Sequence, residues 1–199
     1  MRLQVHVLSS GNGEIDAQTA TKLAPRIDAL HIREKRSSAR DVYELGQQLV
    51  KAGFPKEKLV INDRVDVALA LGAGGVHLGG LSLSPKIVKQ LAPTLRVGRS
   101  IHDVSELTEV EDADYVFYGH IYATASKPGL LPRGIAALEE VVRASHLPVY
   151  AIGGVKPFHI EEIEATGAAG IAVLSGILGA RDPIQATDEF TGRRLDAQL

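Results

Sequence analysis

Eight short apolar runs recur along the chain, and each is followed by a longer segment with helical spacing of its apolar residues. The runs are Leu3–Leu8, Ala29–Ile32, Leu59–Ile61, Gly75–Leu78, Leu95–Gly98, Tyr115–Tyr118, Val149–Ile152 and Gly170–Leu174. Strands that alternate with helices predict a parallel sheet with right-handed crossovers. Eight such units indicate an α/β fold, a single (β/α)8 TIM barrel over residues 1–199.

An open, doubly wound sheet is the alternative fold for alternating strands and helices. That fold usually carries the pattern G-x-G-x-x-G after its first strand, and no complete copy follows the first apolar run here. The chain has 199 residues, whereas barrels typically have about 250, so we expect trimmed loops. Ser84-Pro85 and Asp182-Pro183 predict helix starts, because a capping side chain precedes a proline.

Composition excludes several classes of function. The 22 Lys and Arg residues are balanced by 24 Asp and Glu residues, so the basic surplus of a nucleic-acid-binding protein is missing. Cysteine is absent, which excludes disulfides, a thiol nucleophile and Cys-ligated zinc. No apolar run reaches the roughly 18 residues of a membrane span. We therefore expect a cytoplasmic protein with no nucleic-acid or membrane partner.

Glycine pairs follow the last two predicted strands. Gly153-Gly154 comes after the seventh strand, and Ser175-Gly176 comes after the eighth. Chemistry in TIM barrels takes place at the C-terminal ends of the strands, and the loops after strands seven and eight frequently bind phosphate. Glycine lets backbone N–H groups approach a phosphate closely, and a short helix N-terminus adds a favourable dipole. The pattern predicts a phosphate-binding cup; the alternative is a pair of tight turns.

Histidines occur both in and after the predicted strands. His120 follows the sixth strand, at the start of the irregular stretch 119–133. A histidine there can accept and return a proton near neutral pH; the alternative is a rim histidine that hydrogen-bonds a loop carbonyl. His6, His31 and His77 lie within strands and are expected to be core residues.

Basic residues near strand ends are candidates for binding an anion. Arg33 and Lys35 are two positions apart at the end of the second strand, so both side chains can face the barrel mouth. The alternative is a solvated run with internal ion pairs. Lys127 belongs to the long stretch after strand six and either reaches back over the site or is an ordinary exposed lysine.

An ordered series of motifs resembles the thiamine phosphate synthase superfamily over nearly the whole chain. The matching segments are His31–Lys35, Ile61–Asp66, Gly75–Gly79, Gly98–Ser100, Asp114–Val116 with Gly119, Thr124–Lys127, Ala151–Gly154 and Ser175-Gly176. The resemblance implies a TIM barrel. It also implies substrate-binding roles for Arg33, Lys35, Asn62, Ser100, Thr124, Ser126 and Lys127.

Departures from the synthase pattern select a branch of the superfamily. The resemblance implies that Asp63 matches one of two aspartates that bind magnesium pyrophosphate, but the second position is Ser82. Magnesium is usually held by one or two carboxylates plus substrate phosphates, so the loss of one weakens the site. Gly80 and His31 stand where glutamines are usual. Gly119-His120 looks like the TenI-type thiazole tautomerase branch, in which the acid/base histidine corresponds to His120.

We therefore expect a thiazole tautomerase of thiamine biosynthesis. It would isomerise a phosphorylated carboxythiazole with His120 as the proton shuttle, and it would need no metal and no cofactor. The first alternative is the transferase, thiamine phosphate synthase. The second is a non-catalytic, ligand-sensing barrel. Analogy with the superfamily allows a homodimer.

Overall fold

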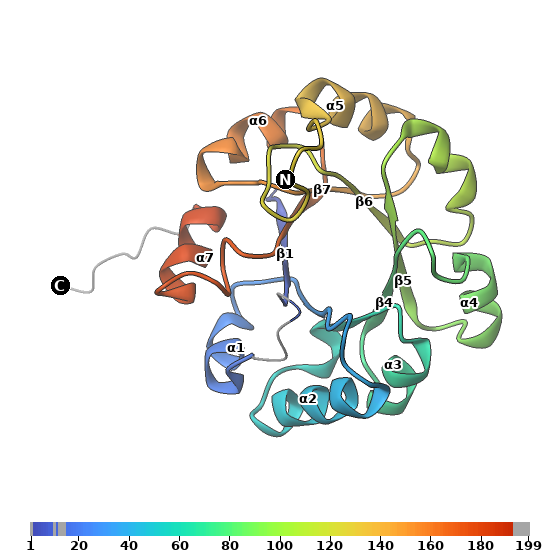
Figure 1. The fold of residues 1–199 in the computed structure, drawn as a ribbon, viewed down its shortest axis with the longest axis vertical. Coiled ribbons are helices and arrows are strands. Elements are labelled where there is room, and N and C mark those ends of the chain that lie inside the picture. Colours follow the sequence, from blue (N-terminus) through green and yellow to red (C-terminus); the bar gives the residue numbers. More distant parts are fainter. Residues whose placement is uncertain (1, 10, 12–14, 193–199) are drawn as a thin grey trace.

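Eight parallel strands close into a barrel in chain order (Figure 1). This computed structural model describes residues 2–9, 11 and 15–192. The strands are β1 (Gln4–Leu8), β2 (Ala29–Ile32), β3 (Leu59–Asn62), β4 (Gly75–Leu78), β5 (Arg96–Ile101), β6 (Tyr115–Gly119), β7 (Val149–Ile152) and β8 (Gly170–Val173). The predicted TIM barrel is confirmed.

Helices form an outer ring around the strands (Figure 1). They are α1 (Ala17–Leu23), α2 (Ala39–Lys51), α3 (Val65–Leu71), α4 (Pro85–Leu91), α5 (Gly134–Ala144), α6 (Ile160–Ala165) and α7 (Pro183–Thr191), with 3-10 helices η1 (Lys56–Lys58), η2 (Val104–Glu109) and η3 (Pro157–His159). Both predicted helix starts are confirmed, since the side chains of Ser84 and Asp182 cap α4 and α7. In the described part of the chain, every helix is too short or too polar to cross a membrane.

Alternation along the strands produces two apolar layers. On β6, Val116 and Tyr118 face the helices and belong to the large outer core, whereas Tyr115 and Phe117 belong to the cluster inside the barrel. This alternation is the two-residue period of a strand. The inner cluster fills the barrel below the C-terminal mouth, so the mouth has a packed floor.

Three histidines complete this inner cluster. The ring of His77 lies 4.1 Å from that of Phe117, and the ring of His6 lies 4.4 Å from that of Tyr150. His31 contacts His6 through ring nitrogens 3.0 Å apart. Burial lowers the pKa of His6 and His31 well below the ordinary value, and it lowers the pKa of His77 to about 3. The rings are therefore neutral at physiological pH, and the predicted core histidines are confirmed.

Strand β5 is longer than predicted. It runs to Ile101 because Arg99 and Ser100 continue the ladder with β6, opposite Val116 and Phe117. The polar sequence Arg99-Ser100 hides this extension from a pattern based on apolar runs. Ser100 therefore lies near the C-terminal end of a strand and not in a loop. Its backbone is held in the sheet at the barrel mouth.

Candidate active site

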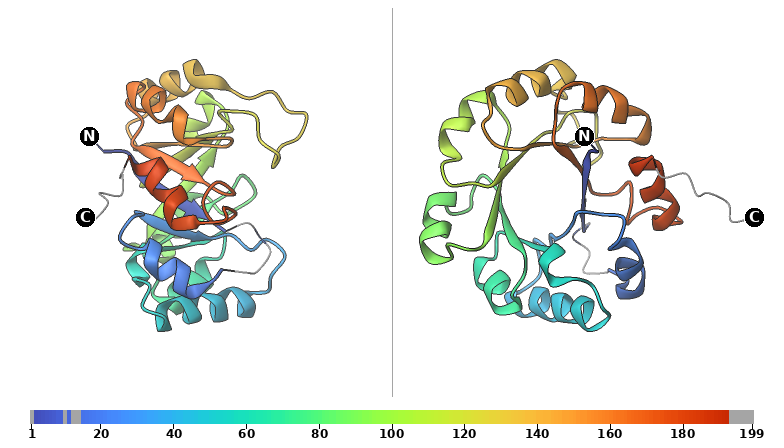
Figure 2. Two further views of the ribbon diagram at one scale, coloured as in Figure 1. Left: turned by 90° about the vertical axis from the view of Figure 1, so that its left-hand side faces the viewer. Right: turned by 180° about the vertical axis from the view of Figure 1, so that it is seen from behind.

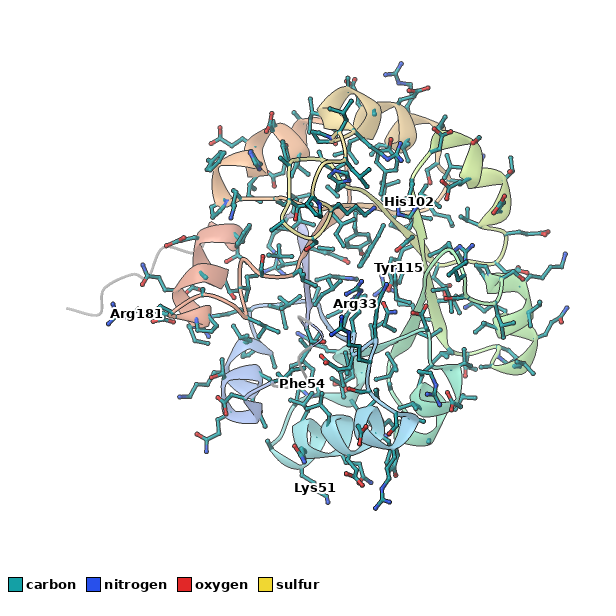
Figure 3. The ribbon with its side chains drawn as sticks, viewed as in Figure 1. Arg33, Lys51, Phe54, His102, Tyr115 and Arg181 are labelled. Atoms are coloured by element: carbon teal, nitrogen blue, oxygen red, sulfur yellow. The ribbon has the colours of Figure 1, made fainter. Side chains whose placement is uncertain are left out.

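A cavity of about 450 Å³ opens at the C-terminal ends of the strands. The long segment between β6 and α5 projects beyond the strands at this end (Figure 2, left). All twelve residues predicted from the sequence line the cavity: Arg33, Lys35, Asn62, Ser100, His120, Thr124, Ser126, Lys127, Gly153, Gly154, Ser175 and Gly176. Figure 3 shows Arg33 inside the ring of strands, whereas Lys51 and Arg181 lie outside it.

Glycines after β7 and β8 form one wall of the cavity. Gly153 and Gly154 both have positive φ, +95° and +70°. A Cβ atom on Gly154 would lie 2.5 Å from the carbonyl oxygen of Ala123 and 2.6 Å from that of Tyr122. The chain therefore requires glycine at position 154 for conformation and for space. Successive glycines in turn conformations are a common framework for backbone N–H groups that bind an anion.

A short helix follows the first glycine pair but not directly the second. Residues 175–179 form turns, and the segment after Gly154 leads into the three-residue 3-10 helix η3. The N–H of Ala180 donates to the carbonyl of Ile177 at 3.0 Å, which closes a turn before Pro183 starts α7. The expected short helix is thus present after Gly153-Gly154, as η3, whereas turns follow Ser175-Gly176.

The opposite wall carries a polar network centred on Asp63. In a closed ring of eight strands, β3 lies across the barrel from β7. The Asp63 Oδ1 atom accepts a hydrogen bond from the Gly79 N–H at 3.0 Å and another from the hydroxyl of Ser82. The Asn62 side-chain amide donates to Oδ2. Ser82 therefore bonds Asp63 directly at the position where the superfamily pattern has a second carboxylate.

Positive side chains gather around Lys127, which lines the same cavity. Burial lowers the pKa of the Lys127 ammonium, and the charges of Arg133 and Lys35 lower it further against the opposing effect of Glu106. Burial also lowers the pKa of His102, and the charge of Lys127 lowers it further. Positive charges that lie this close repel one another, and a bound anion would relieve this repulsion.

Ser100 connects the cavity with the barrel interior. Its Oγ atom is 2.8 Å from Nε2 of His77, whose Nδ1 atom is 3.3 Å from the hydroxyl of Tyr115. His77 and Tyr115 are buried, whereas Ser100 lines the cavity. A line of polar atoms thus connects the barrel core with the cavity.

His120 lies at the edge of the glycine wall. Its side chain is 6% exposed, and Nε2 is 3.4 Å from the carbonyl oxygen of Leu130. A Cβ atom on Gly153 would come within 2.8 Å of the His120 Cα atom, so the histidine packs directly against the glycine loop. The imidazole both lines the cavity and contacts a loop carbonyl, as the alternative interpretation of the sequence expected.

Two titratable side chains in the cavity lining were given no role by the sequence. His102 follows β5, and Lys156 stands two positions after Gly154. Lys156 was predictable from its distance to the glycine pair, because a cation beside a phosphate loop is the simplest addition to such a site. For His102, the signal was its place one residue beyond Ile101, the end of β5.

Comparisons with known proteins agree over most of the chain. The sequence model described as thiamine monophosphate synthase (TMP-TENI) matches residues 7–177. A thiamine-phosphate synthase of Pyrococcus furiosus is 37% identical over 165 residues, covering 81% of this chain and 80% of the relative. One of Anaeromyxobacter dehalogenans is 38% identical over 177 residues, covering 87% and 80%.

A solved structure gives the same result. The thiamine phosphate pyrophosphorylase from Pyrococcus furiosus superposes with a TM-score of 0.84 at 31% identity, covering 96% of this chain and 95% of the other. The 3-hexulose-6-phosphate synthase structure, with a TM-score of 0.67 at 21% identity, shares the fold alone.

These relatives overturn the expectation of a thiazole tautomerase. Their names favour the transferase that we weighed as the alternative. The dipeptide Gly119-His120 is too short a signal against similarity over 165 residues. The comparisons also support an enzyme over a ligand-sensing barrel. The chain belongs to the thiamine monophosphate synthase family.

Proposed function

We propose that this protein is a thiamine-phosphate synthase. It would transfer a pyrimidinylmethyl group from its pyrophosphate to a thiazole phosphate and release pyrophosphate. The observation that carries this proposal is a cavity lined by Gly153 and Gly154 on one side and by Asp63 on the opposite side, with the cations Arg33, Lys35 and Lys127 also in its lining. Two substrates that each carry an anionic end fit such a cavity, and the similarity to thiamine-phosphate synthases favours this reaction over an isomerisation.

Each wall has a proposed ligand. Gly153, Gly154, Ser175 and Gly176 hold the phosphate of the thiazole through backbone N–H groups. Arg33, Lys35 and Lys127 hold the pyrophosphate, with Asn62, Ser100, Thr124 and Ser126 as further polar contacts. Between the walls, Leu8, Phe117, Ile152 and Ala172 form an apolar floor on which two aromatic rings can lie. Holding both reactants in register is the main contribution of such a site.

The proposed step forms one bond and breaks one. The thiazole nitrogen attacks the methylene carbon of the pyrimidine, and the carbon–oxygen bond to pyrophosphate breaks with its electron pair on the departing oxygen. This step transfers no proton, so the shuttle proposed for His120 in an isomerisation is not needed. Instead, His120 positions the thiazole ring beside Gly153, which it contacts. The cationic wall stabilises the charge that develops on the leaving group.

The family resemblance implies magnesium for the pyrophosphate, and the residues present fit a site with one carboxylate. Among the described residues, no three acidic or histidine side chains group as a metal site. Asp63 lines the cavity, and its Oδ2 atom accepts a single hydrogen bond, from Asn62, which leaves one lone pair. One carboxylate plus substrate phosphates is sufficient for magnesium. When bound, the ion neutralises charge on pyrophosphate.

Pyrophosphate release tests the proposal. The purified protein is incubated with magnesium and the pyrimidine pyrophosphate, with and without thiazole phosphate, and pyrophosphate is measured by a coupled enzymatic assay. We expect release only when both substrates are present. Release from the pyrimidine alone would indicate a hydrolase, and no release despite binding of both substrates would indicate a sensor; either result contradicts the proposal.

A further inference from the structure

Ser100 lines the cavity, and two buried residues determine whether its hydroxyl donates or accepts a hydrogen bond. Its oxygen is 2.8 Å from Nε2 of His77, and on the other side of that ring Nδ1 is 3.3 Å from the Tyr115 hydroxyl. These three residues come from β5, β4 and β6. A neutral imidazole carries one N–H and one acceptor nitrogen, so the hydrogens in this line can run in only two ways.

In the first arrangement, hydrogen bonds run outward from the core. Tyr115 donates to Nδ1, Nε2–H donates to Ser100, and the Ser100 hydrogen is left to point into the cavity. In the second, Ser100 donates to Nε2, Nδ1–H donates to Tyr115, and the Tyr115 hydrogen has no acceptor. Among the described residues, His77 is the hydrogen-bond partner of the Tyr115 hydroxyl, and Tyr115 is 1% exposed. An unsatisfied buried donor is costly, so the outward arrangement is favoured.

Gly98 makes the contact possible. It precedes Arg99 and Ser100 on β5, and a Cβ atom at this position would lie 2.5 Å from Nδ1 of His77 and would overlap the Tyr115 hydroxyl. The absence of a side chain on Gly98 therefore opens the space in which Tyr115 and His77 meet. Burial lowers the pKa of His77 to about 3 and raises that of the Tyr115 phenol, so both groups keep their neutral forms around pH 7.

We infer that Tyr115 and His77 are positioning residues that preset the Ser100 hydroxyl as a hydrogen-bond donor toward an anionic substrate oxygen. A hydroxyl in solution can donate or accept, but here its oxygen is occupied by Nε2–H. Ser100 lies beside the Asp63 wall, because its partner His77 accepts a hydrogen bond at its carbonyl oxygen from the Asp63 N–H at 2.9 Å. The anion assigned to that wall is pyrophosphate, and this assignment rests on the proposed function. The direction of the hydrogen bonds is independent of the proposed function.

The tautomer of His77 tests the direction without any substrate. Two-bond nitrogen–proton NMR spectra of the ring, assigned by the signals lost in His77→Gln, report which nitrogen carries the proton. We expect a proton on Nε2 and none on Nδ1 between pH 6 and 8. A proton on Nδ1 would overturn the inference whether or not the protein is a synthase.

Binding of inorganic pyrophosphate with magnesium, measured by calorimetry, tests the consequence. Ser100→Ala and His77→Leu should each weaken affinity by roughly tenfold, the loss of one hydrogen bond to a charged group. The double variant should be no weaker than either single variant, because both remove the same interaction. His77→Gln should stay within a few-fold of the wild type, since its amide can accept from Tyr115 and donate to Ser100.

Two controls separate positioning from folding. His77→Leu combined with Tyr115→Phe removes both buried polar partners, so the melting temperature should recover while the affinity stays low. Tyr150→Phe removes the hydroxyl of a tyrosine that is also 1% exposed but bonds Gln4 and Arg96 and not His77, and it should leave pyrophosphate affinity unchanged. Full affinity in the folded His77→Leu and Tyr115→Phe double variant would contradict the inference, as would additive losses in the cycle with Ser100→Ala.

Discussion

Substitution of Gly154 by alanine tests the glycine wall without adding charge. Alanine at a positive φ costs about 1–2 kcal/mol, and the new methyl group would stand 2.5 Å and 2.6 Å from two loop carbonyl oxygens. Since real Cβ atoms stay beyond about 3.0 Å, the loop must move by roughly half an ångström. Overpacking of this kind adds about 1–3 kcal/mol, so we expect Gly154→Ala to lose about 2–5 kcal/mol of stability.

Function should change more than stability. The displaced backbone carries the N–H groups assigned to the thiazole phosphate, and one lost hydrogen bond to a charged group weakens binding at least tenfold. Steady-state pyrophosphate release should therefore show a KM for thiazole phosphate raised by at least about tenfold. The KM for the pyrimidine pyrophosphate should change much less, because that substrate is assigned to the opposite wall.

Gly192→Ala is the matched control. Gly192 ends α7 at φ +64°, and a Cβ atom there has nothing within 4 Å. This variant has the backbone strain without the crowding, so its melting temperature should fall by about 2–8 °C with normal kinetics. If Gly154→Ala has a normal KM for thiazole phosphate and melts like Gly192→Ala, our assignment of the phosphate to this wall is refuted.

Four further predictions follow from the site and the barrel interior. Ser82→Asp adds a carboxylate beside Asp63 and should lower the magnesium concentration needed for pyrophosphate binding, measured by calorimetry; an unchanged or higher requirement would argue against Asp63 as the magnesium ligand. Lys127→Met removes one cation from the crowded wall and should raise the KM for the pyrimidine pyrophosphate by about tenfold, with an unchanged KM counting against the cationic wall. His120→Asn should keep kcat within about fivefold of wild type, since a loss of a hundredfold or more is typical of a missing proton-transfer group. The interior histidines have lowered pKa values and charge more readily in the unfolded chain, so stability should be complete above about pH 6.5 and fall by about 1.4 kcal/mol per pH unit per histidine below it. Urea unfolding at pH 7 and pH 5.5 measures this, and equal stabilities would mean that the rings are not held neutral.

The strands were predictable because a barrel strand buried on both faces is a short apolar run. The same principle fails at the end of β5, where Arg99 and Ser100 are polar but remain in the ladder with β6. Residues directly after the predicted strands were found in one cavity because parallel strands bring their C-terminal ends to the same edge. The location of the site was thus accessible from the pattern alone.

The relay from Tyr115 to Ser100 was not accessible. This line of hydrogen bonds joins Tyr115, the first residue of β6, through His77 to Ser100, near the C-terminal end of β5. It depends on the missing side chain of Gly98. A contact between residues of three different strands leaves no spacing pattern in the sequence. The choice of reaction also failed, because a two-residue signal, Gly119-His120, selected the branch, whereas the similarity to synthases extends over 165 residues.

Identification of the joined product tests the central claim most directly. The wild-type protein is incubated with magnesium, the pyrimidine pyrophosphate and thiazole phosphate, and the mixture is analysed by mass spectrometry while pyrophosphate is quantified in parallel. We predict one molecule of thiamine phosphate for each pyrophosphate released. Pyrophosphate without thiamine phosphate, or no consumption of either substrate by the folded protein, would contradict the assignment of this barrel as a thiamine-phosphate synthase.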